Sequence, residues 1–185
     1  VNCLKTLKHR YYNLKLIRLS KNFGSHAAIR AGILHTQGQI IAVLSSDLQD
    51  PSILIKSLVE KIKKGYDIVW ATRRSISCSL IEKLFSQAYS FLIRRLAVPG
   101  YPSGGYDVVA FNKKIKKELD NNIESNSSLH LQILNMGFRQ SHIVYDKKLR
   151  NAGKSKWTLT KKIKLFIDSF VAFSYFPIKL VTFVG

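Results

Sequence analysis

Residues 40–51 read IIAVLSSDLQDP, a continuous apolar run from Ile40 to Leu44 that is followed by a polar loop and a proline. An apolar run of this length between helical segments is typical of a parallel strand that is buried on both faces. Asp50 and Pro51 then indicate the start of a helix, with Asp50 as its N-cap and Pro51 at its first position. Because ligands of open α/β sheets bind beyond the carboxyl ends of the strands, this segment predicts a binding site in the loop between strand and helix.

Strand and helix patterns alternate on both sides of this segment. We expect the other strands at Leu14–Leu19, Tyr66–Thr72, Asp107–Phe111 and Phe138–Tyr145. We expect helices at Ser25–Thr36, from Pro51 up to Gly65, at Leu80–Leu96 and in the region that ends at Met136. The side chains expected to face the core are Leu54, Leu58 and Ile62 in the second helix and Leu84, Ala88, Phe91 and Leu92 in the third. The alternation predicts an α/β fold built on a parallel sheet.

The chain is strongly basic, with 30 Lys and Arg against 11 Asp and Glu in 185 residues, a formal net charge of +19. This balance indicates an anionic partner, which is nucleic acid, lipid headgroups or a phosphorylated substrate. Cys3 and Cys78 form no CxxC pair, so neither a disulfide framework nor a zinc site is indicated. A hydrophobic fraction of 46% is enough for one domain with a sizeable core.

The loop after Leu44 carries side chains that suit a divalent cation. Asp47 and Gln49 are two residues apart, so in an extended loop both can face one cavity and offer hard oxygen ligands to Mg²⁺ or Mn²⁺. The alternative is a plain strand-to-helix loop whose carboxylates only cap the next helix, and it suits Asp50 better than Asp47. A position of the preceding strand at an antiparallel edge of the sheet would count against the metal site.

Two basic groups further along the chain indicate anion binding. Arg73 and Arg74 follow a predicted strand, although one of two adjacent strand-end arginines is usually just exposed. Arg150, Ser155 and Lys156 lie in a glycine-containing loop, where two cations and a hydroxyl can surround a phosphate. The alternative for this second group is a solvated basic loop.

The C-terminal region has the pattern of a helix that lies on a membrane surface. Its apolar face holds Leu159, Ile163, Phe166, Ile167 and Phe170, and the lysines off that face are Lys161, Lys162 and Lys164. The alternative is an ordinary amphipathic core helix. The apolar stretch 170–185 is shorter than the roughly 20 residues that span a bilayer, so we expect it to be the beginning of a spanning segment that has been cut.

Four segments, in this order, resemble family 2 glycosyltransferases related to dolichyl phosphate mannosyltransferase and to bacterial polyprenyl phosphate glycosyltransferases. They are SKNFGSHAAIRAG at Ser20–Gly32, SSDLQDP at Ser45–Pro51, the arginines Arg73 and Arg74, and RNAGKSKW at Arg150–Trp157. The family has SRNFG, DADLQDP, arginines after the next strand, and RxxGxSKW or RxxGxSKY. The likeness runs from about Leu14 to the C-terminus, and the order of four segments is far more specific than any one of them.

The resemblance implies a Rossmann-like nucleotide-sugar domain of the GT-A type at residues 1–157, incomplete at its N-terminus. It implies amphipathic juxtamembrane helices and the start of a membrane segment at residues 158–185. By the same resemblance, Asp47 and Gln49 bind Mg²⁺ or Mn²⁺, which holds the diphosphate of the nucleotide sugar. Ser45 stands where the family has the first Asp of its DxD, so water or the Ser45 hydroxyl fills that ligand position.

The resemblance also implies roles outside this loop. Asp107 in GGYDVVAF matches the Asp of the family's GDFRL segment, which is proposed as the catalytic base, while Val109 replaces the Arg. A phosphate monoester already loses its second proton near pH ~6, so the alternatives are that Asp107 orients the acceptor or the sugar, or is a plain turn carboxylate. The residues expected to bind substrate phosphates are Arg73, Arg74, Arg150, Ser155 and Lys156, and those expected to bind membrane are Lys161, Lys162, Lys164, Phe166 and Phe170.

The implied reaction is inverting transfer of a sugar from a UDP- or GDP-linked donor to undecaprenyl or dolichyl phosphate, at the cytoplasmic face of the cell membrane, by an integral membrane protein. The family's first strand and acidic nucleoside-binding residues are expected before Leu14. Their absence, together with Ser45, supports a second hypothesis, a catalytically inactive fragment that acts at most as a membrane-binding module. Charge alone suggests a nucleic-acid binder, but the sequence has no RRM, KH, zinc-finger or helix-turn-helix pattern, so we expect no nucleic-acid partner.

Overall fold

The computed structural model describes residues 13–74, 80–96, 100–102, 105–106, 108–122 and 128–148, with isolated positions at Leu4, Thr6, Tyr11, Val98, 167–168 and 182–183. The chain divides into two compact units, Val1–Thr36 and Gln37–Gly185. Within the described ranges, no helix is both long and apolar enough to cross a bilayer.

The first unit contains helix α2 (Ser25–Leu34), which confirms the helix predicted there. It starts after Gly24, whose φ of 90° favours glycine, and the Gly24 amide donates to Asn22 Oδ1 at 2.9 Å. The strand predicted at Leu14–Leu19 is wrong, because none of these residues forms a strand and the central Leu16 and Ile17 are exposed. Apolar residues in a short segment are compatible with a strand, but they do not supply the neighbour that a strand needs.

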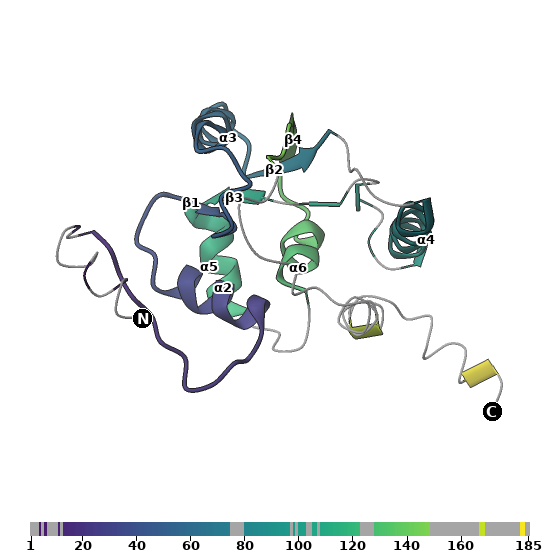
Figure 1. Ribbon diagram of the computed structural model, residues 1–185, viewed down its shortest axis with the longest axis horizontal. Helices are drawn as coiled ribbons and strands as arrows, with labels where there is room; N and C mark the ends of the chain where they lie inside the picture. Colours follow the sequence, from purple (N-terminus) through teal and green to yellow (C-terminus); the bar gives the residue numbers. More distant parts are fainter. Residues whose placement is uncertain are drawn as a thin grey trace. The chain divides into compact units, whose positions relative to one another are not determined.

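The second unit is built on a sheet in which the described strands have the order β1-β3-β2-β4 (Figure 1). The strands are β1 (Ile40–Val43), β2 (Ile68–Arg73), β3 (Val108–Asn112) and β4 (Gln140–Tyr145). β3 runs antiparallel to both of its neighbours, whereas β2 and β4 are parallel. The strands lie where predicted, but the expectation of a parallel sheet is wrong. A buried apolar run marks a strand and carries no information about its direction.

Helix α3 (Ile53–Lys63) covers one face of this sheet (Figure 1). Leu54, Leu58 and Ile62 are buried, as their spacing on one side of a helix predicts. They pack against alternate residues of three strands, namely Val69, Ala71, Val108, Ala110 and Tyr145. The loop that joins β1 to α3 is therefore anchored at both of its ends by packed elements.

Helices α5 (Lys113–Asn121) and α6 (Leu129–Asn135) lie on the other face of the sheet (Figure 1). The intervening strand residues supply this second core and are fully buried: Ile68, Trp70, Val109 and Phe111. The Trp70 indole donates to Gln140 Oε1 at 2.7 Å, so its polar atom is satisfied inside the core. The fold is thus a mixed α/β arrangement with helices on both faces of the sheet.

Helix α4 (Leu80–Leu96) has the predicted bounds but not the predicted orientation. The residues expected in the core, Leu84, Ala88, Phe91 and Leu92, are exposed, Leu84 to 68% and Phe91 to 65%. Ser90 and Ile93 are buried instead. Apolar residues spread around much of this helix, and so wide an apolar face does not determine which part packs inward.

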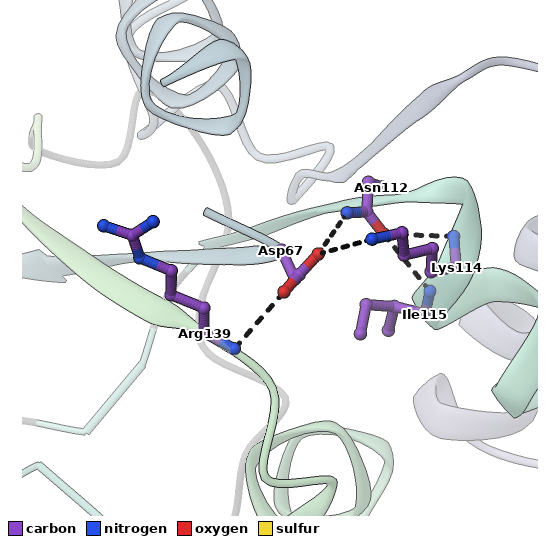
Figure 2. Close-up of polar contacts among 5 residues, drawn as sticks. All are labelled: Asp67, Asn112, Lys114, Ile115 and Arg139. Atoms are coloured by element: carbon purple, nitrogen blue, oxygen red, sulfur yellow. Dashed lines mark hydrogen bonds and ion pairs between the residues drawn. The ribbon is translucent and has the colours of Figure 1, made fainter. Parts of the chain in front are cut away.

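A polar cluster joins three strands at the edge opposite the carboxyl end of β1 (Figure 2). Asp67, just before β2, accepts a hydrogen bond from Asn112 Nδ2 at 2.7 Å and one from the Arg139 amide at 3.4 Å. Lys114 Nζ lies 4.0 Å from the same carboxylate. Asn112 Oδ1 in turn accepts from the amides of Lys114 and Ile115 and caps α5. The cluster fixes the starts of β2 and β4 against the end of β3.

Candidate functional site

The carboxyl ends of β1, β2 and β4 lie at one edge of the sheet, which we call the carboxyl edge. These strands point the same way because antiparallel β3 lies between β1 and β2, and β2 pairs in parallel with β4. The loop 44–52 follows β1, Arg74 follows β2, and residues 146–148 follow β4. Val108, the first residue of β3, lies at the same edge opposite Ala71. The chain thus brings four separate segments to one edge.

Among the described strands, β1 is outermost on its side of the sheet and pairs with antiparallel β3. This position counts against the predicted metal site, for which a strand inside a parallel sheet was expected. The general rule still applies to this edge, because ligands of open α/β sheets bind beyond strand carboxyl ends and three such ends are present.

The loop after β1 turns sharply, in contrast to the extended loop expected for the metal site. Leu48 has a φ of 59°, a left-handed conformation that costs a leucine about 1–2 kcal/mol. Across this turn, the Asp47 carboxylate accepts a hydrogen bond from the Gln49 amide at 3.3 Å. The Leu48 side chain is 72% exposed, so its packing does not offset the strain. Strained residues of this kind cluster at ligand sites.

Gln49 contacts the segment that follows β4. Its side-chain Nε2 donates to the carbonyl oxygen of Lys148 at 3.1 Å. The Lys148 amide donates back to the Gln49 carbonyl at 3.0 Å. These two hydrogen bonds fasten the loop after β1 to the chain beyond β4, and they orient the Gln49 amide with its nitrogen towards Lys148.

Asp50 is buried at the carboxyl edge and does not cap α3, contrary to expectation. Its Oδ1 accepts a hydrogen bond from the Tyr145 hydroxyl at 2.5 Å and lies 3.6 Å from Lys147 Nζ. The residue at the N-cap position of α3 is Ser52, so Pro51 lies outside the helix. The phenol and ammonium groups are donors that the sequence pattern around Pro51 could not reveal.

The two arginines at the end of β2 differ in their surroundings. Arg73 is half-buried within the strand, and Arg74 is exposed beyond it. Arg74 Nε lies 3.3 Å from Asp146 Oδ1, with both side chains mostly exposed, so this ion pair contributes little to stability. Both arginines lie at the carboxyl edge, on the same side of the sheet's strand ends as the loop after β1.

An aromatic cluster lies next to the start of β3. The Tyr106 ring is 4.1 Å from the buried Trp70 ring, and Tyr101 meets Tyr106 edge-on at 5.3 Å. Burial, with a smaller effect of Tyr101, raises the pKa of the Tyr106 phenol far above its usual value, so this group stays neutral. Through its ring contact with Trp70, Tyr106 anchors the backbone immediately before position 107 to the core.

Several predicted site residues lie outside the described part of the chain. They are Asp107, Arg150, Ser155, Lys156, Lys161, Lys162, Lys164, Phe166 and Phe170. The C-terminal amphipathic helices expected over residues 158–185 fall almost wholly in the same category. Val109, which stands in place of an arginine of the family segment, is fully buried in the sheet.

The donor set of the loop fits a hard divalent cation that shares its coordination with a ligand. Asp47 offers a carboxylate, Gln49 an amide oxygen and exposed Ser45 a hydroxyl. Within the described ranges, no group of three or more His, Cys, Asp and Glu residues is arranged to hold a metal. A site with one carboxylate suits Mg²⁺, which keeps several waters and binds substrate phosphates.

Sequence reasoning missed Tyr145, Lys147 and Lys148, which contact the loop after β1. Tyr145 was expected only as the last residue of a strand, and the two lysines were noted only for their charge. A tyrosine at the end of a strand with lysines after it was the only hint in the sequence. Their contacts with the loop join positions 95 to 99 residues apart, which local spacing does not predict.

Comparison with known proteins gives a consistent result. Residues 1–143 match the sequence profile of glycosyl transferase family 2. The chain is 32% identical over 173 residues to an uncharacterized glycosyltransferase, sll0501, of Synechocystis sp., and 32% identical over 173 residues to the uncharacterized glycosyltransferase YkcC of Bacillus subtilis. It is 28% identical over 169 residues to the undecaprenyl-phosphate 4-deoxy-4-formamido-L-arabinose transferase of Erwinia tasmaniensis. These alignments cover 91–93% of this chain but 52–54% of the relatives, so the chain spans about half of their length.

Proposed function

The chain belongs to glycosyl transferase family 2, and on that premise we propose that the full-length protein transfers a sugar from a nucleotide sugar to a polyprenyl phosphate. The observation that carries this proposal is the carboxyl edge, where the Asp47 loop, the Arg73–Arg74 pair and the basic segment after β4 come together. Such an edge suits a ligand that carries several phosphate charges.

Two further observations support a lipid phosphate as the acceptor. The relative from Erwinia tasmaniensis is named for transfer to undecaprenyl phosphate. The net charge of +19 suits a protein whose donor, acceptor and membrane surface are all anionic. The proposed acceptor is therefore undecaprenyl or dolichyl phosphate, and the proposed donor is a UDP- or GDP-linked sugar.

Asp47, Gln49 and Ser45 would hold a divalent cation, Mg²⁺ or Mn²⁺. When bound, this cation neutralises charge on the diphosphate of the donor. Arg73 and Arg74, at the carboxyl end of β2, would bind the same phosphates.

The reaction would be a single inverting displacement. An oxygen of the lipid phosphate forms a bond to the anomeric carbon, and the bond from that carbon to the nucleoside diphosphate breaks with its electron pair on the leaving oxygen. Arg150, Ser155 and Lys156 would orient the acceptor phosphate. Asp107 would orient the acceptor or the sugar, because a phosphate monoester is largely deprotonated above pH ~6 and needs little help from a base.

We place this reaction at the cytoplasmic face of the cell membrane. Residues 158–185 would bind that surface through the apolar side chains Phe166 and Phe170 and through the lysines Lys161, Lys162 and Lys164. In liposome flotation, replacing the three lysines by Gln should weaken binding to anionic vesicles and leave weaker binding to neutral vesicles nearly intact. A wild-type chain that stays unbound on anionic vesicles at low salt would show that this segment belongs to the core.

The reaction itself is tested with the full-length protein in purified membranes. Labelled UDP- and GDP-sugars are supplied with undecaprenyl phosphate, dolichyl phosphate or the corresponding unphosphorylated alcohols. We expect a lipid-linked sugar with one donor class, dependent on added Mg²⁺ or Mn²⁺ and on the lipid phosphate. Product on the alcohols, or no product with any donor, would contradict the proposal.

A second candidate function is a catalytically inactive, membrane-binding relative of these enzymes. Ser45 favours it, because this position lacks the carboxylate of the family motif and leaves Asp47 as the nearby anionic ligand. Ser45→Asp in the full-length protein separates the two candidates. If the site is active but weak, the wild type should transfer sugar and the substitution should raise Mn²⁺ affinity and lower the Mn²⁺ concentration needed, whereas an inactive relative should show no transfer as wild type.

A further inference from the structure

Asp50 is a buried carboxylate that the proposed reaction does not use. Its side chain is 1% exposed and that of its partner Lys147 is 17% exposed. Within the described part of the chain, Oδ2 accepts no hydrogen bond, so the described contacts that hold the carboxylate are made by Tyr145 and Lys147 through Oδ1. A charge buried to this degree is costly unless it is paired and hydrogen-bonded. Asp50 is therefore the common acceptor of two donors that come from the end of β4 and the residues after it.

The contacts of Asp50 and Gln49 form one unit, which we call the loop clamp. It consists of the hydrogen bond from Tyr145 to Asp50, the ion pair with Lys147 and the two hydrogen bonds between Gln49 and Lys148. On one side the clamp holds the loop that carries Ser45 and Asp47. On the other side it holds the chain two residues before Arg150.

We propose that Asp50 is a positioning residue that holds the cation-binding loop against residues 145–148 at the end of β4. This inference rests on the proposed function. Neither segment is held by regular secondary structure where they meet, because the loop turns at strained Leu48 and β4 ends at Tyr145. Without the clamp, the strained turn would relax and the Gln49 side chain would lose the contact with Lys148 that fixes its orientation.

We expect removal of the clamp to weaken Mn²⁺ binding and to loosen the backbone at Lys148 together, which a loss of global stability alone would not do. Outer partners of metal ligands typically change metal affinity by about 10- to 100-fold when they are removed. Asp50→Asn keeps the size of the side chain and an acceptor for Tyr145 but removes the charge that pairs with Lys147. Tyr145→Phe keeps the buried ring and removes only the hydroxyl donor.

The matched control is Asp120→Asn, which breaks the partly buried ion pair between Lys116 and Asp120 within α5. This pair lies in the helix on the face of the sheet opposite α3, so its loss should lower thermal stability without changing the loop. Each variant of the full-length protein is compared with wild type by Mn²⁺ binding, by amide hydrogen exchange at Lys148 and by the KM and kcat of sugar transfer.

We expect Asp50→Asn and Tyr145→Phe to raise the Mn²⁺ dissociation constant about tenfold, to speed exchange at Lys148 and to raise KM for the nucleotide sugar more than they lower kcat. Asp120→Asn should leave all of these values at wild-type levels. Unchanged Mn²⁺ affinity and Lys148 exchange in both clamp variants, with only a lower melting temperature, would overturn the inference while wild-type transfer stands. A wild-type protein that neither binds Mn²⁺ nor transfers sugar would instead overturn the proposed function and the positioning role together.

Discussion

The hydroxyl of Tyr145 donates a hydrogen bond to the carboxylate of Asp50, which lies 95 residues earlier in the sequence. The Tyr145 ring belongs to the core beneath α3, where it packs with Leu54 and Leu58. Its hydroxyl reaches the carboxyl edge at the end of β4. A single side chain therefore links the packing of the sheet to the geometry of the loop after β1.

The strained turn at Leu48 leads to a prediction about stability. Leu48→Gly should relieve about 1–2 kcal/mol of left-handed strain and cost about 0.5–1 kcal/mol through the entropy of the unfolded chain, so the expected net change is a gain of about 0–1.5 kcal/mol. Leu48→Ala retains the strain and loses an exposed side chain, so it should change little. Urea denaturation measures both variants. If Gly is less stable than Ala at this position, the left-handed conformation of residue 48 is wrong.

The polar cluster at the opposite edge predicts a larger effect. Asn112→Ala removes the cap of α5, which costs about 0.5–2 kcal/mol, and it also deprives the Asp67 carboxylate of a donor. Asn121→Ala, at the exposed last position of α5, is the matched control and should have almost no effect. Equal losses of unfolding free energy in the two variants would contradict the cluster drawn in Figure 2.

His142 predicts how stability depends on pH. Burial lowers the pKa of His142 from its usual 6.5, and the nearby charge of Lys61 lowers it further. The unfolded chain then binds this proton more readily than the folded chain. The contribution of neutral His142 to the free energy of unfolding is complete above about pH 6.5 and declines as the pH falls below that value. Urea denaturation should be measured on both sides of pH 6.5. Below pH 6.5 the unfolding free energy of His142→Gln should fall less steeply with decreasing pH than that of wild type, and equal slopes would contradict this prediction.

The sequence predicted the elements of the second unit well because each has a distinct local pattern. Leu54, Leu58 and Ile62 recur at helical spacing, and the runs at Ile40–Val43 and Val108–Phe111 are apolar without interruption. These patterns reflect burial of one helical face or of both strand faces, which are local properties of the chain. The positions of β1, α3 and β3 followed from them.

The direction of β3 and the orientation of α4 could not be read in the same way. The run from Val108 to Phe111 is buried on both faces whichever way the strand points. In α4, Phe91 and Ile93 are both apolar, and only the tertiary packing decides that Ile93 is the buried residue. The segment Leu14–Leu19 is rich in apolar residues like a strand but does not form one.

At the candidate site, the sequence indicated which segments lie at the carboxyl edge but not the contacts between them. The segment SSDLQDP pointed to the loop after β1, and the structure brings this loop to the same edge as Arg73 and Arg74. The predicted role of Asp50 as a helix cap was wrong, because its partners Tyr145 and Lys147 come from the end of β4 and the residues after it, which are distant in sequence. Contacts of that range depend on the register of the whole sheet rather than on local spacing.

The central claim is most directly tested by measuring lipid-linked sugar formation by full-length Asp47→Asn at limiting Mn²⁺. Removing the carboxylate of the loop should lower the initial rate by more than about 100-fold, a larger effect than the 10- to 100-fold typical of outer partners of a metal. Glu60→Gln, which neutralises an exposed carboxylate on α3, should transfer sugar at the wild-type rate. Equal rates for wild type, Asp47→Asn and Glu60→Gln would show that this loop does not hold the donor, and the proposed site would be wrong.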